Sequence, residues 1–155
     1  MRHRIHSKNL IAMKSTAIIV TAVAAMEIAT PIEAKEASSH FTIRELAYSS
    51  TAQRLGLDNT PPPEAVVYMQ RLIDEVLEPA RRSLGAPIKV NSGYRCKALN
   101  NAVGGVARSY HLSGRAADIT TGSAEGNREL WSILCGLPHK ELIWERGGAW
   151  IHVAW

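Results

Sequence analysis

The sequence predicts an α+β domain in which helices come first and a small, mostly antiparallel sheet follows. Apolar residues recur at three- and four-residue steps over residues 63–84, which is typical of a long amphipathic helix. Short alternating stretches fill the second half, and the turn Arg146–Gly148 separates the last two. The chain has 155 residues, of which 46% are hydrophobic and 21% are charged, so one globular domain with one core is expected.

The first helices of the domain are expected to be short. Thr42 followed three residues later by Glu45 is a capping-box pattern, which places a helix start there. The run Ser49–Thr51 supplies a second capping region before another short helix. A polar linker precedes these helices, so the domain is expected to span residues 40–155.

The helix over residues 63–84 is the strongest in the chain. Thr60 lies just before the prolines at its start and is expected to cap it. Pro79 should kink or interrupt the helix because proline has no N–H to donate, and Gly85 should end it. Beyond it, strands are expected over residues 88–91, 116–120, 141–145 and 149–155, and helices over residues 97–103 and 122–135.

Residues 1–39 are expected to form a signal peptide or a disordered extension outside the fold. Residues 1–14 are basic and contain no acids, and residues 15–26 form a short run of small and β-branched apolar side chains. This run is too short to span a bilayer, so no stable membrane span is expected. Cleavage after Ala34 would fit a signal peptide. We therefore predict a periplasmic or secreted protein, and a chain that stays in the cytoplasm until phage-type lysis is the alternative.

The cysteine spacing argues against a cysteine metal site, and the charge distribution argues against a nucleic-acid-binding protein. Cys96 and Cys135 form no CxxC metal pair. They are expected to be unbridged, buried small hydrophobes, although an oxidising compartment would allow them to pair. The net charge is +4, and no basic run with interleaved aromatic residues occurs, so nucleic acid is not an expected partner. The mild positive charge suits an anionic substrate.

A candidate metal site is indicated by His111, by Asp118 seven residues later, and by His152 near the C-terminus. Within a strand, Asp118 points opposite to Ala117 and Ile119, and His152 alternates with apolar neighbours in the last strand. If these two strands are neighbours, the two side chains can converge. Two imidazoles and one carboxylate can hold zinc and leave a fourth position for water. At this spacing, a His–Asp pair is also common as a surface or hydrogen-bonded couple.

Four segments stand in an order and spacing that together are highly specific. They are Ser92-Gly93-Tyr94-Arg95, Asn100 to Gly105, Ser109 to Asp118, and Trp150 to Val153. They resemble the motifs of the D-alanyl-D-alanine carboxypeptidase-like zinc peptidases, which have the hedgehog/DD-peptidase fold. Residues 40–62 also resemble one branch of that family, so the likeness covers essentially the whole domain.

The resemblance implies a role for each matched residue. His111, Asp118 and His152 match the zinc ligands. Arg95 matches an arginine that orients the substrate and stabilises charge on the attacked carbonyl, a task that suits a guanidinium. A structural salt bridge is the alternative for this residue. Ser109 matches a polar position beside the metal and is expected to bind substrate or to hydrogen-bond a ligand.

The chain departs from the family at the general base. Several members carry the acid three residues before the last zinc histidine, which is Ala149 here, and others carry a histidine at the position of Trp150. Glu145 is the predicted base, because a hairpin can fold it back beside that histidine and because the related hedgehog domain has a glutamate in a similar strand. A surface glutamate paired with Arg146 is the alternative for Glu145. Glu141 is the second candidate for the base.

The predicted function is a zinc metallopeptidase that hydrolyses amide bonds of peptidoglycan stem peptides next to D-amino acids. It would act as a D,D-carboxypeptidase or as a murein endopeptidase, with Zn²⁺ as cofactor, the stem peptide as partner and a monomer as the expected state. One alternative is a relative that keeps zinc for structure and binds peptidoglycan or a protein without cutting. The missing acid at position 149 keeps this alternative open. A phage-type endolysin is the other alternative.

Overall fold

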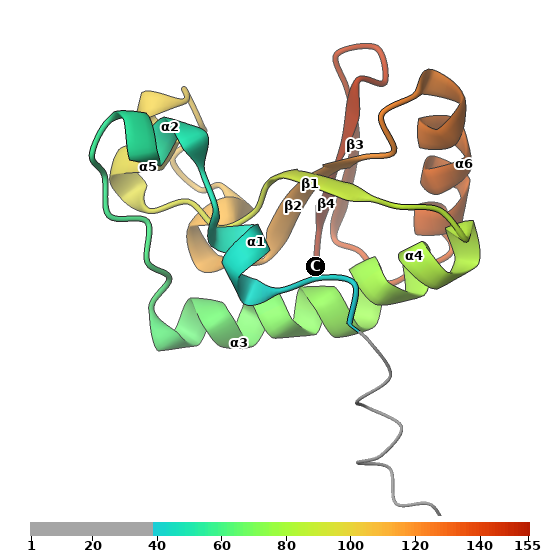
Figure 1. Cartoon of the computed structure of the whole chain (residues 1–155), viewed down its shortest axis with the longest axis horizontal. Coiled ribbons are helices and arrows are strands. Elements are labelled where there is room, and N and C mark those ends of the chain that lie inside the picture. Colours follow the sequence, from blue (N-terminus) through green and yellow to red (C-terminus); the bar gives the residue numbers. More distant parts are fainter. Residues whose placement is uncertain (1–38) are drawn as a thin grey trace, which may run out of the picture.

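One antiparallel sheet organises the described part of the chain, residues 39–155 of a computed structural model. The signal-peptide and cleavage predictions fall on residues 1–38 and lie outside it. Across the sheet the strand order is β1-β2-β4-β3, and all three pairs are antiparallel. The predicted α+β class is therefore confirmed, and so is the C-terminal hairpin (Figure 1). The strands are β1 (Lys89–Ser92), β2 (Ala116–Thr120), β3 (Glu141–Glu145) and β4 (Trp150–Ala154).

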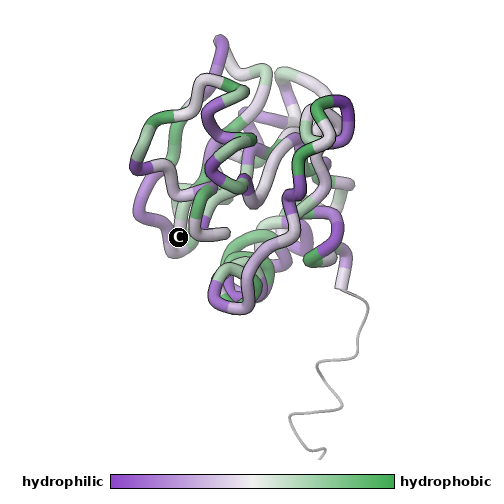
Figure 2. The backbone as a smooth tube through the Cα atoms, turned by 90° about the vertical axis from the view of Figure 1, so that its left-hand side faces the viewer, coloured by the Kyte–Doolittle hydropathy of each residue, from purple (hydrophilic) through white to green (hydrophobic). Residues whose placement is uncertain are grey.

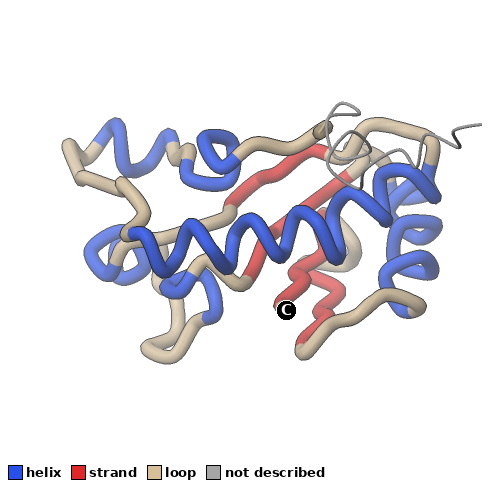
Figure 3. The backbone as a smooth tube through the Cα atoms, turned by 90° about the horizontal axis from the view of Figure 1, so that it is seen from below, coloured by secondary structure: helices blue, strands red, loops and turns tan. Residues whose placement is uncertain are grey.

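The long amphipathic segment forms one continuous helical run that crosses the sheet (Figures 1 and 3). It comprises α3 (Pro63–Leu72), the π-helical segment η2 (Ile73–Leu77) and α4 (Glu78–Leu84). The N–H of Glu78 bonds to the carbonyl of Ile73, five residues back, so the helix widens directly before Pro79. The expected interruption at Pro79 thus takes the form of a π-helical turn. Gly85, with a φ of 66°, ends the run as predicted.

The predicted cap of this run was wrong. Pro62 occupies the N-cap position and makes no side-chain hydrogen bond. The first helical residue is Pro63, which has no N–H that needs a partner, so a side-chain cap is less necessary there. The backbone N–H of Thr60 instead donates to the carboxylate of Asp58 at 2.8 Å, which closes a local turn.

Serine and threonine caps start several of the shorter helices. The hydroxyl of Thr42 accepts from the N–H of Glu45 at 3.1 Å, and the hydroxyl of Ser49 accepts from the N–H of Ala52 at 3.2 Å. The two capping predictions are therefore confirmed. The shorter elements are α1 (Ile43–Ala47), α2 (Ser50–Arg54), α5 (Lys97–Ala102), the 3₁₀ turn η3 (Tyr110–Ser113) and α6 (Ala124–Cys135).

The core lies between one face of the sheet and the helices. Ile119 of β2 and Ile151 of β4 are fully buried and belong to a cluster with side chains of the long helical run and of α6. Figure 2 shows the apolar positions of the long helix turned toward the rest of the domain. Because side chains alternate along a strand, the opposite face of β2 and β4 is left for polar residues. Within residues 39–155, no helix is long and apolar enough to cross a bilayer.

Both cysteines are free thiols. Neither is buried, however: Cys96 is half-buried and Cys135 is exposed. Cys96 occupies the N-cap position of α5, where its Sγ lies 3.4 Å from the N–H of Leu99. It therefore acts as a weak helix cap rather than as a core residue.

Candidate active site

Strand pairing brings two of the three predicted ligands together. Asp118 of β2 lies directly opposite His152 of β4, so both side chains point to the same face of the sheet. On the other side of β2, Ser92 at the end of β1 lies opposite Asp118, after a bulge that follows Val90. The polar face therefore extends across three neighbouring strands, as the sequence pattern predicted for two of them.

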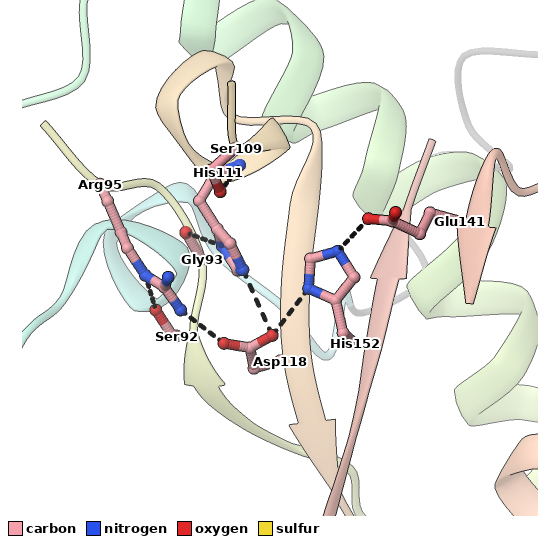
Figure 4. A network of polar contacts seen from close by, with 8 residues as sticks. All are labelled: Ser92, Gly93, Arg95, Ser109, His111, Asp118, Glu141 and His152. Carbon is pink, nitrogen blue, oxygen red and sulfur yellow. Dashed lines mark hydrogen bonds and ion pairs between the residues drawn. The ribbon is translucent and has the colours of Figure 1, made fainter. Parts of the chain in front are cut away.

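The third predicted ligand, His111, enters from the 3₁₀ turn η3. Gly114 ends this turn with a φ of 73°, and a Cβ at this position would lie 2.6 Å from the carbonyl oxygen of Ala65. A glycine is therefore required where the chain turns from His111 into β2. The turn aims the imidazole at Asp118 (Figure 4).

The three side chains form a compact, buried cluster. His111 Nε2 lies 3.2 Å from Asp118 Oδ1, and His152 Nδ1 lies 2.9 Å from the same oxygen. One ligand atom from each residue falls within 4.8 Å of the others. The exposed fractions are 2% for His111, 9% for Asp118 and 8% for His152. This is the arrangement in which three protein ligands can surround one cation.

The hydrogen bonding of His111 tests whether the cluster suits a cation. His111 Nδ1 lies 2.6 Å from the carbonyl oxygen of Gly93, which can only accept, so this nitrogen carries the proton. In a neutral ring, Nε2 then presents a lone pair to the carboxylate of Asp118. Two acceptors facing each other in a buried site require either a proton or a metal ion between them. The donor set therefore fits a metal such as zinc.

Opposing influences act on the carboxyl group of Asp118. Burial raises its pKa, but the polar contacts with His111 and His152 and the positive charge of Arg95 outweigh burial. The net result is a pKa far below the usual range of an aspartate. Asp118 is therefore an anion at neutral pH, as a metal ligand must be.

Arg95 contacts the cluster directly. Its guanidinium lies 2.5 Å from Asp118 Oδ2, and its Nε donates to the hydroxyl of Ser92 at 2.8 Å. The other carboxylate oxygen, Oδ1, is the one that faces the two histidines. The predicted alternative of a structural ion pair is thus present, and Arg95 also lines the hollow above the cluster.

Ser109 lies at the start of η3 and lines the same hollow. Its hydroxyl accepts from the backbone N–H of His111 at 3.3 Å. The contact is with the main chain of a predicted ligand rather than with the imidazole. Ser109 therefore helps to fix the turn that carries His111.

The two candidate bases lie on the same face of β3. Glu141 pairs with Ala154 and Glu145 pairs with Trp150, on either side of the pair formed by Ile143 and His152. Glu141 Oε2 lies 3.2 Å from His152 Nε2, a contact at ion-pair distance that lacks hydrogen-bond alignment. Among the described residues, no hydrogen bond or ion pair joins the side chain of Glu145 to His152.

A hollow of about 600 Å³ lies over the cluster. One wall is the segment Val103–Ser109, and the opposite wall is the β3–β4 hairpin, with both glutamates. The guanidinium of Arg146 lies over the ring of Trp150, 5.2 Å from its centre, and within residues 39–155 no ion pair joins it to Glu145. Glu145 is half-buried and lines this hollow, where a general base would have to lie.

Comparison with known families decides the class of protein. The family model described as Peptidase M15 matches residues 39–154. The chain belongs to the Peptidase M15 family. No curated protein matches the chain. The resemblance inferred from the motifs is therefore confirmed at the level of the family.

Membership of the M15 family implies that the chain is a peptidase, and zinc dependence is typical of that family. The cluster of His111, Asp118 and His152 can bind a metal ion. The match covers nearly all the described residues, so the whole domain, and not one motif, carries the likeness.

Supporting residues of the M15 domain went unrecognised as such in the sequence. Asn59 donates to the carbonyls of Ala47 and Tyr94 at 2.9 and 3.1 Å and accepts from the N–H of Cys96 at 2.7 Å. It thereby fixes the segment that carries Arg95. The only sequence signal was its place in a motif that resembles the family.

Asn127 of α6 supports the opposite wall. It is 1% exposed, and its amide nitrogen donates to the carbonyl of Gly148 at 2.8 Å and to that of Ala149 at 3.3 Å. Its amide oxygen accepts from the N–H of Thr121 at 2.8 Å. Asn127 thus ties the turn of the hairpin to β2, and no sequence pattern indicated it.

Proposed function

We propose that this M15 peptidase hydrolyses amide bonds next to D-amino acids in peptidoglycan stem peptides, with zinc as its cofactor. The observation that supports this most strongly is the buried His–Asp–His cluster at the floor of a hollow in a domain of this family. Three protein ligands leave room for water or substrate at a fourth position, which is the pattern of catalytic zinc sites. The digestion products distinguish the two activities: a carboxypeptidase releases D-alanine, and an endopeptidase releases shorter muropeptides.

The atoms proposed to hold zinc are His111 Nε2, Asp118 Oδ1 and His152 Nδ1. When bound, zinc would supply a Lewis acid that polarises the substrate carbonyl and acidifies water. The carbonyl of Gly93 keeps the proton on the far nitrogen of His111, which leaves Nε2 free as a ligand. Arg95 holds the second oxygen of Asp118 and so leaves Oδ1 free to face the histidines.

We assign the transfer of protons to Glu145. Its carboxylate would accept a proton from the attacking water and pass it to the leaving amine. Glu145 is half-buried in the wall of the hollow and lies on the edge strand β3. Arg95 follows β1, which is the strand at the opposite edge of the sheet. Arg95 would add positive charge near the carbonyl oxygen as negative charge develops there.

We assign Glu141 a positioning role. Its carboxylate lies beside the nitrogen of His152 that faces away from Asp118. A carboxylate behind a histidine ligand keeps the proton on the outer nitrogen and makes the inner nitrogen a better ligand. Glu141 would therefore act on metal affinity, whereas Glu145 would act on turnover.

Digestion of purified peptidoglycan, with mass analysis of the products, tests the activity. We expect the zinc-loaded protein to release D-alanine or shorter muropeptides, and we expect a chelator to stop the release. A protein that binds zinc but releases nothing would instead be the non-catalytic relative, which Ala149 at the position of the family acid keeps open.

The same substitution at two positions separates the two glutamates. Glu145→Ala should lower kcat by about 10²- to 10⁴-fold with zinc affinity unchanged. Glu141→Ala should lower zinc affinity by about 10- to 100-fold. Glu129→Ala, on the exposed side of α6, is the matched control and should change neither quantity. The reverse result, with turnover lost in Glu141→Ala at full zinc occupancy, would make Glu141 the base.

We further propose that the protein acts outside the cytoplasm. The basic N-terminal flank and the short apolar run of residues 15–26 support export. Mass spectrometry of protein from the producing cells should find an N-terminus near Lys35. An intact Met1, together with release only at cell lysis, would favour the endolysin alternative.

A further inference from the structure

A second hollow, of about 350 Å³, lies beside the end strand β1. All four residues of the strand, Lys89–Ser92, line it, together with Tyr48–Thr51 and with Leu99 of α5. Side chains of consecutive residues point to opposite faces of a sheet, so four in a row can line one hollow only where it follows the edge of the strand. Within residues 39–155, β1 pairs only with β2, so this is the free edge of the sheet in the described part of the chain.

The second hollow adjoins the one over the metal cluster. Arg95 and Val103 line both of them. Val103 is 46% exposed, so its side chain is available to a bound molecule at this boundary. An extended molecule that lies along β1 would therefore reach the cluster by passing Arg95.

The groups that line the second hollow suit a peptide. A free strand edge presents N–H and C=O groups that an extended chain can pair with, as in β-strand addition. Three hydroxyl side chains in Ser49–Thr51 add further hydrogen-bonding groups on the facing wall. Lys89 lies three residues before Ser92, or about 10 Å along the strand, and supplies a positive charge there.

The strand order indicates which half of a substrate would lie there. Glu145 on β3, the proposed proton donor to the leaving amine, lies at the opposite end of the sheet from β1. The leaving half of the substrate should therefore lie toward the hairpin. The acyl half should lie toward Arg95 and β1.

Given the peptidase activity proposed above, we propose that the acyl half of the substrate adds as an extended strand to the free edge of β1. Lys89 would bind a carboxylate on this half, about three residues from the bond that is cut. The edge of β1 would thus select for the length and charge of the acyl side, separately from the groups that hold metal.

Kinetics with two synthetic peptides test the inference. Both end in D-alanyl-D-alanine. The short peptide has a single acetylated residue on the acyl side of the bond that is cut. The long peptide has four residues on that side, and the third residue from the bond carries a carboxylate. We expect a lower KM for the long peptide. Lys89→Glu should raise that KM by about three- to tenfold with kcat unchanged, and should leave the short peptide unaffected. N-methylation of the acyl-side backbone amides of the long peptide should also raise KM.

Lys97→Glu is the matched control, because Lys97 is exposed on α5 and lines neither hollow. Equal effects of the two charge reversals, or the same KM for both peptides, would overturn the inference.

A binding measurement separates this inference from the proposed activity. With ¹⁵N-labelled, zinc-loaded protein, the long peptide should shift the amide signals of Lys89–Ser92 and leave those of α6 in place. Shifts without cleavage would support the edge site and reject the peptidase activity. Cleavage without shifts in β1 would support the activity and reject the edge site.

Discussion

The two faces of β2 and β4 belong to the same strands but are held by different forces. On one face, Ile119 and Ile151 are fully buried in the apolar core. On the other face, Asp118 and His152 meet in a polar cluster that also includes His111. Adjacent residues are therefore held in different ways. The isoleucine side chains are held by packing, and the neighbouring Asp118 and His152 are held by hydrogen bonds and charge.

The contrast shows how the cluster obtains its geometry. Packing of the core face fixes the register of β2 against β4, and that register sets Asp118 opposite His152. A shift of one residue would exchange the two faces, so the polar cluster depends on the register, which a single truncated core side chain should leave in place. We expect core substitutions to lower stability and cluster substitutions to lower metal binding, with little overlap between the two effects.

The adjacent residues Ile151 and His152 give the sharpest test and the largest expected effect. Ile151→Ala should lower the free energy of unfolding by about 2–5 kcal/mol, because it leaves a cavity in the core. His152→Ala should cost about 1 kcal/mol in the metal-free protein but should abolish tight zinc binding. Urea unfolding in the presence of a chelator measures the first quantity, and competition with a zinc-binding dye measures the second.

Two results would break this comparison. Folded Ile151→Ala that has lost zinc affinity would show that the core sets the ligands directly. Tight zinc binding by His152→Ala would remove that residue from the ligand set, and the cluster would then need another donor.

The sequence predicted the fold because its local signals agree. The three- and four-residue apolar steps marked the long helical run, and alternation marked the strands of the hairpin. The same alternation set Asp118 and His152 each opposite its apolar neighbours, so that the two would share a face if their strands were adjacent. The capping prediction for Thr60 failed because a helix that starts with Pro63 needs less capping.

Alternation could not distinguish Glu141 from Glu145. The two residues are four positions apart and therefore share a face of β3. Which carboxylate approaches His152 depends on how the side chains lie across the twisted hairpin, and no local pattern records that. The support from Asn127 was equally hidden, since it joins segments that are distant in the sequence.

Asn127 tests whether the wall of the hollow, like the cluster, depends on hydrogen bonds. Asn127→Ala should destabilise the protein by about 1–3 kcal/mol, because it leaves the half-buried N–H of Thr121 and the buried carbonyl of Gly148 without these partners. We also expect faster hydrogen exchange in the turn Arg146–Gly148 and a lower kcat, since Glu145 directly precedes that turn. Asn101→Ala, on the exposed side of α5, should change none of these quantities. Unchanged exchange in the turn of Asn127→Ala would contradict the role assigned to Asn127.

The smallest expected effect lies far from the cluster, where Glu78 anchors the start of the domain. Its carboxylate accepts from the N–H groups of His40 and Phe41 and from the hydroxyl of Ser39, and it lies 3.7 Å from Arg82. Burial raises its pKa, but the hydrogen bonds and the charge of His40 outweigh burial and lower it below the ordinary value of 4.5. The charged form is therefore favoured in the folded state.

A lowered pKa in the folded state stabilises the protein above pH 4.5 and loses this effect as the pH falls through the folded value. Glu78→Gln should therefore cost about 1 kcal/mol at pH 7, and the difference from the wild type should shrink as the pH falls below 4.5. Urea unfolding over this range, with Glu129→Gln as an exposed control, measures it. A constant difference at all pH values would show that Glu78 acts through its shape and not through its charge.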